Sequence, residues 1–221
     1  MNGAQMTDGY AFQREQMVGR LRDHYHIRDE KVLGAMFSVP RHFFVPTALQ
    51  AKAYGDHALP ISASQTISQP YIVAKMTELL ELKPGDKVLE IGAGSGYQTA
   101  ILSRLARAVY AVERVPELGA EAESRLRQLS ANNVSFKIGD GTLGWELYSP
   151  YDAVLVAAGG PEAPQPLLNQ LKIGGKLVIP IGKDAESQRL VRYTRTEKEF
   201  IAEDFGACSF VPLIGAHGWD K

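Results

Sequence analysis

The hydrophobic and polar positions divide the chain into two regions with different spacing. Over residues 11–82 apolar side chains recur at helical intervals, and prolines separate the pattern into short pieces. Asp29 is placed to cap one of these helices, and residues 69–82 form a clearer amphipathic helix pattern. The front of the chain is therefore predicted to be helical, with an irregular loop over residues 56–67.

Beyond residue 82, short apolar runs alternate with longer amphipathic stretches. We predict strands at residues 87–91, 109–113, 134–138, 153–157 and 176–181. Helices are predicted between them at residues 97–106, 116–131 and 166–171. Repeated strand–helix–strand units imply parallel strands with right-handed crossovers, so that both faces of the sheet are covered. Two further strands, 189–194 and a broken one over 200–213, follow without a helix between them. The fold class is therefore α/β, a Rossmann-like doubly wound sheet that is mostly parallel, with an antiparallel C-terminal edge and an N-terminal helical elaboration.

Composition and charge narrow the class of protein. Hydrophobic residues make up 45% and charged residues 22% of the chain, values typical of soluble globular proteins. With 24 Lys plus Arg against 25 Asp plus Glu, the net charge of −1 offers no general attraction to nucleic acid or to an anionic membrane. The single cysteine, Cys208, cannot form an internal disulfide, and no Cys/His cluster indicates zinc. We therefore expect a cytoplasmic protein without a metal.

A glycine-rich loop follows the first predicted strand, with Gly92, Gly94 and Gly96 directly before a helical pattern. In a doubly wound sheet, nucleotide-like ligands bind at such a loop, where glycines permit a tight turn and close approach. A dinucleotide fingerprint would read G-x-G-x-x-G, whereas here the spacing differs and Glu90 precedes the glycines. A carboxylate repels pyrophosphate and suits an ammonium group. The pattern therefore favours S-adenosyl-L-methionine and disfavours an NAD-dependent oxidoreductase.

Two further acids lie at the ends of predicted strands. Glu113 ends the second strand, where a carboxylate can accept hydrogen bonds from both ribose hydroxyls. Asp140 and Gly141 follow the third strand, where the acid could receive the adenine amino group. Each acid alone would be read as an ordinary solvated carboxylate. Three such signals in chain order, each at a strand end, predict one nucleoside site.

Thr66-Ile67-Ser68-Gln69-Pro70 and Val211-Pro212-Leu213, together with the glycine loop, resemble motifs of the protein-L-isoaspartate (D-aspartate) O-methyltransferases, which are class I S-adenosylmethionine-dependent methyltransferases. The Glu-x-Gly-x-Gly-x-Gly pattern is shared by methyltransferases at large, whereas Thr-Ile-Ser-Gln-Pro at residues 66–70 and Val-Pro-Leu at 211–213 are more specific. The resemblance covers about residues 17–213. Its other motifs are Val39-Pro40-Arg41, Phe44-Val45-Pro46, Leu59-Pro60-Ile61, Tyr97-Gln98-Thr99-Ala100, Val112-Glu113-Arg114 and Gly139-Asp140-Gly141.

The resemblance implies an activity and a set of site residues. The activity is transfer of a methyl group from S-adenosyl-L-methionine to the free α-carboxylate of L-isoaspartyl residues, which leads through a succinimide back to aspartate. Ser68 would be the active-site hydroxyl. The cofactor would contact Thr66 and Gly141 in addition to the loop and acids named above, and the substrate would contact Ile67, Ser68, Val211, Pro212 and Leu213. The implied partners are isoaspartyl-containing proteins and peptides, and the protein is expected to be a monomer.

Other interpretations stay open. The Ser68 hydroxyl could instead cap the helix that begins at Gln69. A methyltransferase acting on tRNA or on a small metabolite would use the same cofactor fold, and a non-catalytic cofactor-binding protein would retain it without turnover. Ala93 and Ala157 replace small hydroxyl residues common in the family, and residues 214–221 match no motif.

The 221 residues are expected to form one domain. In this division residues 1–10 are a mobile polar start and residues 11–82 supply helices and the active-site loop. Residues 83–221 form the cofactor-binding α/β core.

Overall fold

The computed structural model describes residues 9–184 and 187–219. The mobile start predicted over residues 1–10 therefore lies almost wholly outside the described residues. Tyr10, at its end, is packed: its ring stacks on that of His42 with centroids 4.3 Å apart.

The described residues form a seven-stranded sheet in the order β5-β4-β3-β6-β7-β8-β9. The first five strands in this order are parallel, and β8 and β9 are antiparallel to their neighbours. The predicted α/β class, with its antiparallel C-terminal edge, is thereby confirmed. The strands are β3 (Lys87–Ile91), β4 (Ala108–Glu113), β5 (Val134–Ile138), β6 (Tyr151–Val156), β7 (Leu171–Ile181), β8 (Arg189–Arg195) and β9 (Phe200–Ala207).

The chain winds away from β3 in two directions, first through β4 to β5 and then back through β6 to β7. The carboxyl ends of β3 and β6 are therefore adjacent while the connections leaving them diverge. In doubly wound sheets this divergence opens a crevice in which ligands bind.

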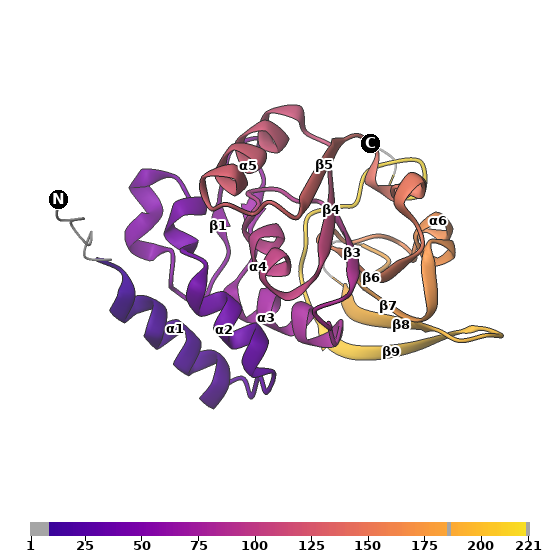
Figure 1. The fold of residues 1–221 in the computed structure, drawn as a ribbon, viewed down its shortest axis with the longest axis horizontal. Coiled ribbons are helices and arrows are strands. Elements are labelled where there is room, and N and C mark those ends of the chain that lie inside the picture. The colour runs from indigo at the N-terminus through magenta and orange to yellow at the C-terminus, as the bar shows by residue number, and fades with distance from the viewer. Residues whose placement is uncertain (1–8, 185–186, 220–221) are drawn as a thin grey trace.

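Helices cover both faces of the sheet and extend beyond it on one side (Figure 1). They are α1 (Ala11–Asp23), α2 (Glu30–Ser38), α3 (Pro70–Leu79), α4 (Tyr97–Leu105), α5 (Pro116–Gln128) and α6 (Gln165–Asn169). Short 3₁₀ segments occur at η1 (Arg41–Phe44), η2 (Thr47–Lys52), η3 (Gly141–Leu143) and η4 (Glu146–Tyr148), and β1 (Leu59–Pro60) pairs with β2 (Thr66–Ile67). Among the described residues no helix combines the length and apolar character needed to cross a membrane.

Alternate side chains of β3 pack into two different hydrophobic cores, one on each face of the sheet. Val88 packs with Met76 of α3 and Leu102 of α4 on one face. Leu89 packs on the other face with Leu167 of α6. Because successive side chains of a strand point to opposite faces, a strand covered on both sides is apolar at nearly every position. Polar groups are consequently concentrated at the strand ends, where the site lies.

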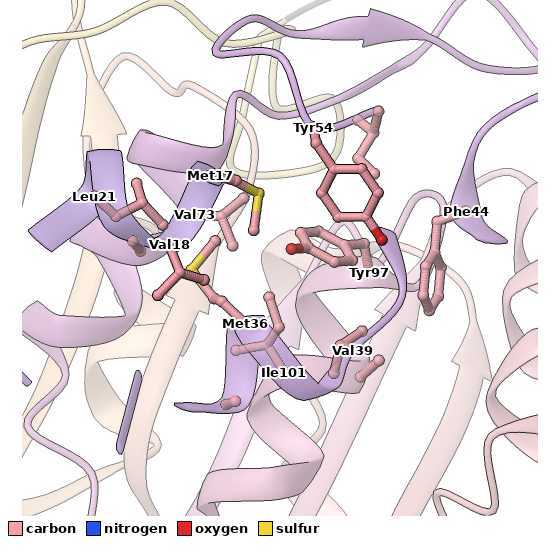
Figure 2. Packing of buried hydrophobic residues seen from close by; sticks show 14 of the residues in the cluster. Met17, Val18, Leu21, Met36, Val39, Phe44, Tyr54, Val73, Tyr97 and Ile101 are labelled. Carbon is pink, nitrogen blue, oxygen red and sulfur yellow. The ribbon is translucent and has the colours of Figure 1, made fainter. Parts of the chain in front are cut away.

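The helical front of the chain docks on α4, the helix that follows the glycine loop. Figure 2 shows Met17 of α1, Met36 of α2, Val73 of α3 and Ile101 of α4 converging in one buried cluster. Each fully buried apolar side chain of this size contributes roughly 1.5–3 kcal/mol relative to exposure. The front helices are therefore fixed relative to the glycine loop by apolar packing.

Several element boundaries differ from the prediction. The helix predicted over residues 69–82 ends at Leu79, because Glu81 adopts a left-handed conformation with φ 52°. Strand β7 begins five residues before the predicted start, since Gly174, with φ 81°, forms an irregularity inside the strand instead of ending it. The broken strand predicted over 200–213 leaves the sheet after Ala207.

Asp29 caps α2 as predicted: its carboxylate accepts hydrogen bonds from the backbone N–H groups of Lys31 at 2.8 Å and Val32 at 3.4 Å. We expect Asp29→Ala to lower the free energy of unfolding by about 1 kcal/mol in urea titrations, because two N–H groups of the first turn lose their acceptor. Asp29→Asn retains an acceptor oxygen and should lose less than half as much. Equal losses in both variants would contradict a capping role.

Candidate functional site

Three cavities meet at the carboxyl ends of β3 and β6. The first, here called the central cavity, measures about 150 Å³ and is lined by the ends of β3, β4 and β6 together with residues 211–214. The second, the outer cavity, measures about 540 Å³ and lies between residues 66–72 and 207–211. A small cavity of about 40 Å³ lies between Ser68 and the glycine loop. Thr66 and Ala157 line all three cavities, which places the predicted active-site segment at their junction.

The glycine loop adopts a conformation that only glycine accommodates easily. Gly92, Gly94 and Gly96 have φ values of 83°, 54° and 88°, all in the left-handed region. A Cβ added to Gly96 would lie 3.1 Å from the side chain of Ala122 on α5. Gly92 and Gly94 line the central cavity, where the absence of side chains leaves the backbone open to a ligand.

Glu113 is anchored at the wall of the central cavity. Its carboxylate accepts one hydrogen bond from Gly94 N at 2.8 Å and another from Val115 N at 2.9 Å. It is 6% exposed and lines the cavity. A carboxylate can accept about four hydrogen bonds, so Glu113 retains capacity for two hydroxyl donors of a ligand. The predicted ribose acceptor thus lies beside the predicted glycine loop.

Glu90 is fully buried, and neither of its carboxylate oxygens has a hydrogen-bond partner among the described residues. Burial raises the pKa of Glu90 to about 8, and the nearby charge of Glu113 adds to this rise. Unlike Gly92, Glu90 does not line the central cavity. The structure therefore places it behind the cavity wall, where burial favours the neutral form of the acid.

The predicted adenine-binding acid is engaged by protein donors. Asp140 Oδ1 accepts hydrogen bonds from the N–H and hydroxyl of Thr142 at 2.8 and 2.7 Å, and Oδ2 accepts one from Ala216 N at 2.8 Å. Burial opposes ionisation, but these hydrogen bonds outweigh it and hold the pKa of Asp140 below its ordinary value. Gly141 lines the central cavity whereas Asp140 does not. A direct contact of Asp140 with adenine stays a prediction.

Residues 214–219, which matched no motif, contribute to the site. Ile214 lines the central cavity, and Trp219 Nε1 donates a hydrogen bond to Gly159 O at 2.9 Å. Gly215 lies against Asp140, where a Cβ would come within 2.1 Å of the carboxylate. In the sequence, Gly215 was the one sign that the chain makes a close contact here, and nothing in the pattern showed that the contact is with Asp140.

Ser68 presents a free hydroxyl at the junction of the outer and small cavities. The N-cap of α3 is Gln69 and no side chain caps this helix, so the capping interpretation of Ser68 is wrong. Its hydroxyl forms no hydrogen bond with any residue that the structure describes. The hydroxyl is therefore available to a ligand.

The backbone of Ser68 is held by a buried arginine. Arg41 is fully buried and donates from Nη2 to Ser68 O and from Nε to Ala53 O, both at 2.7 Å. Its guanidinium also lies 4.9 Å from the ring centroid of Tyr97, the first residue of α4. Arg41 thus links the segment carrying Ser68 to the helix that begins after the glycine loop. The sequence marked Arg41 only as part of a family motif.

The predicted substrate segment lies along Gly159, which follows β6. Gly159 N donates to Val211 O and Leu213 N donates to Gly159 O, each at 2.8 Å. Val211 lines both the central and the outer cavity, while Pro212 lines the central one. The side chains of Leu213 and of Ile67, at the other wall, are buried in the two cores. Leu213 nevertheless lines the central cavity and Ile67 the small one, so the structure brings the predicted substrate residues to the cavities from two sides.

Glu90 makes protein stability depend on pH. An acid whose folded pKa of about 8 exceeds its ordinary value of 4.5 stabilises the fold at low pH, and this contribution is lost as the pH rises through 8. Glu90→Gln keeps the shape and stays neutral. We therefore expect it to raise the Tm of the ligand-free protein at pH 9 and to change it little at pH 5 in thermal melts. Glu15→Gln, at an exposed position, is the control; equal effects of Glu90→Gln at both pH values would contradict this assignment.

Comparisons of sequence identify the relatives of this chain. A model of the family described as protein-L-isoaspartate(D-aspartate) O-methyltransferase matches residues 12–218. The protein-L-isoaspartate O-methyltransferase of Dictyoglomus turgidum is 52% identical over 210 residues, which cover 95% of this chain and 94% of the relative. Protein-L-isoaspartate O-methyltransferase 1 of Geotalea uraniireducens is 55% identical over 194 residues, covering 87% and 89% of the two chains.

Solved structures agree with the sequences. A protein-L-isoaspartate O-methyltransferase superposes with a TM-score of 0.83 at 29% identity, covering 93% of this chain and 67% of the other. A Plasmodium falciparum protein described by the same activity, in complex with S-adenosyl-L-homocysteine, superposes with a TM-score of 0.79 at 26% identity, covering 91% and 98% of the two chains. The fold is that of the class I methyltransferases, and the chain belongs to the protein-L-isoaspartate (D-aspartate) O-methyltransferase family.

Proposed function

We propose that this protein is a repair methyltransferase that moves a methyl group from S-adenosyl-L-methionine to the free α-carboxylate of L-isoaspartyl residues in damaged proteins and peptides. Family membership supports the reaction. The observation that supports the site is the unpartnered Ser68 hydroxyl, fixed through its own carbonyl by Arg41 and located where the cavities meet.

The residues around the central cavity fit S-adenosyl-L-methionine. The backbone of Gly92 and Gly94 would receive the cofactor, and Glu113 would accept its ribose hydroxyls while keeping its two backbone hydrogen bonds. Thr66 and Gly141 would complete the wall, with Gly96 permitting the turn of the loop. Glu90 would ionise in response to the ammonium group, because an opposite charge nearby lowers the pKa of a carboxyl. When bound, the cofactor supplies a methyl group already activated on a sulfonium.

The substrate carboxylate needs no general base. An α-carboxyl group has an ordinary pKa of about 3.3–3.7, so it is an anion at neutral pH. The chain's task is therefore orientation, and the Ser68 hydroxyl would donate a hydrogen bond to one carboxylate oxygen so that the other faces the methyl group. The segment from Val211 to Leu213 would hold the substrate backbone from the opposite wall.

The outer cavity suits recognition of a backbone. None of the side chains that line it is charged. The cavity would therefore neither attract nor repel charged residues that flank the isoaspartate in a substrate. Once methylated, the ester is attacked by the neighbouring backbone nitrogen, which closes a succinimide and releases methanol. Hydrolysis of the ring then yields aspartate or isoaspartate, and repeated cycles move the residue toward aspartate.

The composition of the chain also bears on its compartment, oligomeric state and partners. We infer that it works in the cytoplasm, where its single cysteine, Cys208, would stay reduced. A monomer suffices for the reaction, since both walls of the outer cavity come from one chain. Proteins and peptides, and neither nucleic acid nor membranes, are its proposed partners, in keeping with the net charge of −1.

Replacing Ser68 tests its role directly. Loss of a hydrogen bond to a charged group costs about 1.5–3 kcal/mol, so Ser68→Ala should lower kcat/KM for an isoaspartyl peptide about 10- to 100-fold. The Kd for S-adenosyl-L-methionine, measured by calorimetry, should stay within twofold. Ser62→Ala removes an exposed hydroxyl from the β1–β2 hairpin that precedes Ser68, where its one partner among the described residues is the exposed Glu121 carboxylate, and should retain activity. Full activity of Ser68→Ala would overturn the assignment.

Paired peptides test the reaction. With methyl-labelled S-adenosyl-L-methionine, a peptide containing L-isoaspartate should incorporate label, whereas the same sequence with L-aspartate should not. The label should be released as methanol at mildly alkaline pH as the succinimide forms. Equal labelling of the two peptides would sink the repair function, and labelling of tRNA alone would favour the RNA methyltransferase alternative.

A further inference from the structure

A buried glutamine supports the wall of the outer cavity that faces Ser68. Gln188 is 2% exposed and lies directly before β8. Its side-chain oxygen accepts a hydrogen bond from Phe210 N at 2.7 Å, and its side-chain nitrogen donates one to Phe210 O at 3.1 Å. One amide therefore satisfies both backbone groups of a residue that lines the cavity.

This amide replaces a missing strand neighbour. The chain leaves the β8–β9 ladder after Ala207, and the Cys208 N–H still donates to the Gln188 carbonyl at 3.0 Å. Beyond that point Phe210 has no ladder partner, and the Gln188 amide supplies the hydrogen bonds that a neighbouring strand would otherwise give its backbone. A glutamine carries one acceptor and two donors on a neutral group, whereas Glu and Lys each lack one of these capacities.

Gly159 makes room for the same amide. A Cβ added there would lie 2.4 Å from the Gln188 side-chain nitrogen. Gly159 also forms the two backbone hydrogen bonds with Val211 and Leu213 described above. The four residues from Phe210 to Leu213 are thus fixed by Gln188 at one end and by Gly159 along the rest.

We propose that Gln188 is a positioning residue for substrate binding, acting through Phe210 to set the wall that faces Ser68. The inference rests on the proposed function for the identity of the peptide substrate. Gln188 itself does not line the outer cavity, so its effect on the substrate would be transmitted through the backbone that it holds. Loss of this amide should weaken binding of the peptide much more than binding of S-adenosyl-L-methionine, because Phe210, the residue that it holds, lines the outer cavity and not the central one.

The chain contains a matched control for this arrangement. Gln170, 7% exposed, accepts a hydrogen bond from Trp145 N at 3.0 Å and donates one to Leu143 O at 2.9 Å. A Cβ on Gly144 would come within 2.3 Å of it, as at Gly159. Gln170 thus makes the same pair of hydrogen bonds with a segment that does not line the outer cavity. A general loss of stability would affect both glutamines alike.

The experiment compares Gln188→Met with Gln170→Met in the full chain, since methionine keeps the length of glutamine and removes its amide. Steady-state kinetics with an isoaspartyl peptide and calorimetry with S-adenosyl-L-methionine are measured below the Tm of each variant. We expect both variants to lose stability. Only Gln188→Met should raise the peptide KM, by about tenfold or more, because small displacements of a binding wall have large effects. Its kcat and cofactor Kd should stay within about twofold of the unsubstituted protein.

Gln188→Asn is the second variant, should Gln188→Met fail to fold. It keeps a neutral amide on a shorter side chain that cannot reach both backbone groups of Phe210 in their present positions, so a smaller rise in peptide KM is expected. An unchanged peptide KM in a folded Gln188 variant, or an equal rise in Gln170→Met, would overturn the positioning role. An unsubstituted protein that does not prefer isoaspartyl peptides would instead overturn the proposed function.

Discussion

The parallel pairing of β3 with β6 is the constraint on which the site depends. It places Ile91 beside Val156, and the chain leaves these two strand ends in opposite directions. Everything that contacts the central cavity is arranged around this divergence: the glycine loop after β3, the acid at the end of β4 and Gly159 after β6. Since β3 is buried on both faces, its position cannot shift without disturbing two cores. The polar groups are therefore held by an apolar scaffold that has little freedom to move.

Around this scaffold the protein uses buried or half-buried polar side chains to hold irregular backbone. Arg41 holds Ser68, Asp140 holds Ala216 and Gln188 holds Phe210. In each case the segment lies outside regular secondary structure, and the side chain supplies hydrogen bonds that a helix or strand would otherwise provide. Such contacts fix one side of a loop by hydrogen bonds and leave its other side open.

The sequence predicted what depends on local pattern. The bounds of β3 were predicted without error because five consecutive residues enter a fully covered sheet, and Asp29 was recognised because its partners are two and three residues away. The glycine loop and Glu113 were predicted by the same reasoning. The sequence did not reveal that Arg41 reaches Ser68 or that Gln188 reaches Phe210, since these contacts join distant segments without a periodic signal. The early end of α3 was also missed, because Glu81 takes a left-handed backbone conformation that usually indicates glycine.

The two walls of the outer cavity limit the shape of the chain that can lie between them. The walls are chain segments, one near Ser68 and one near Phe210, so the proposed substrate would enter between them as an extended strand of chain. An isoaspartate inside an intact helix or a sheet interior would need local unfolding to take that shape. Under the proposed function, the rate of repair in a given protein would therefore depend on how often the damaged stretch opens.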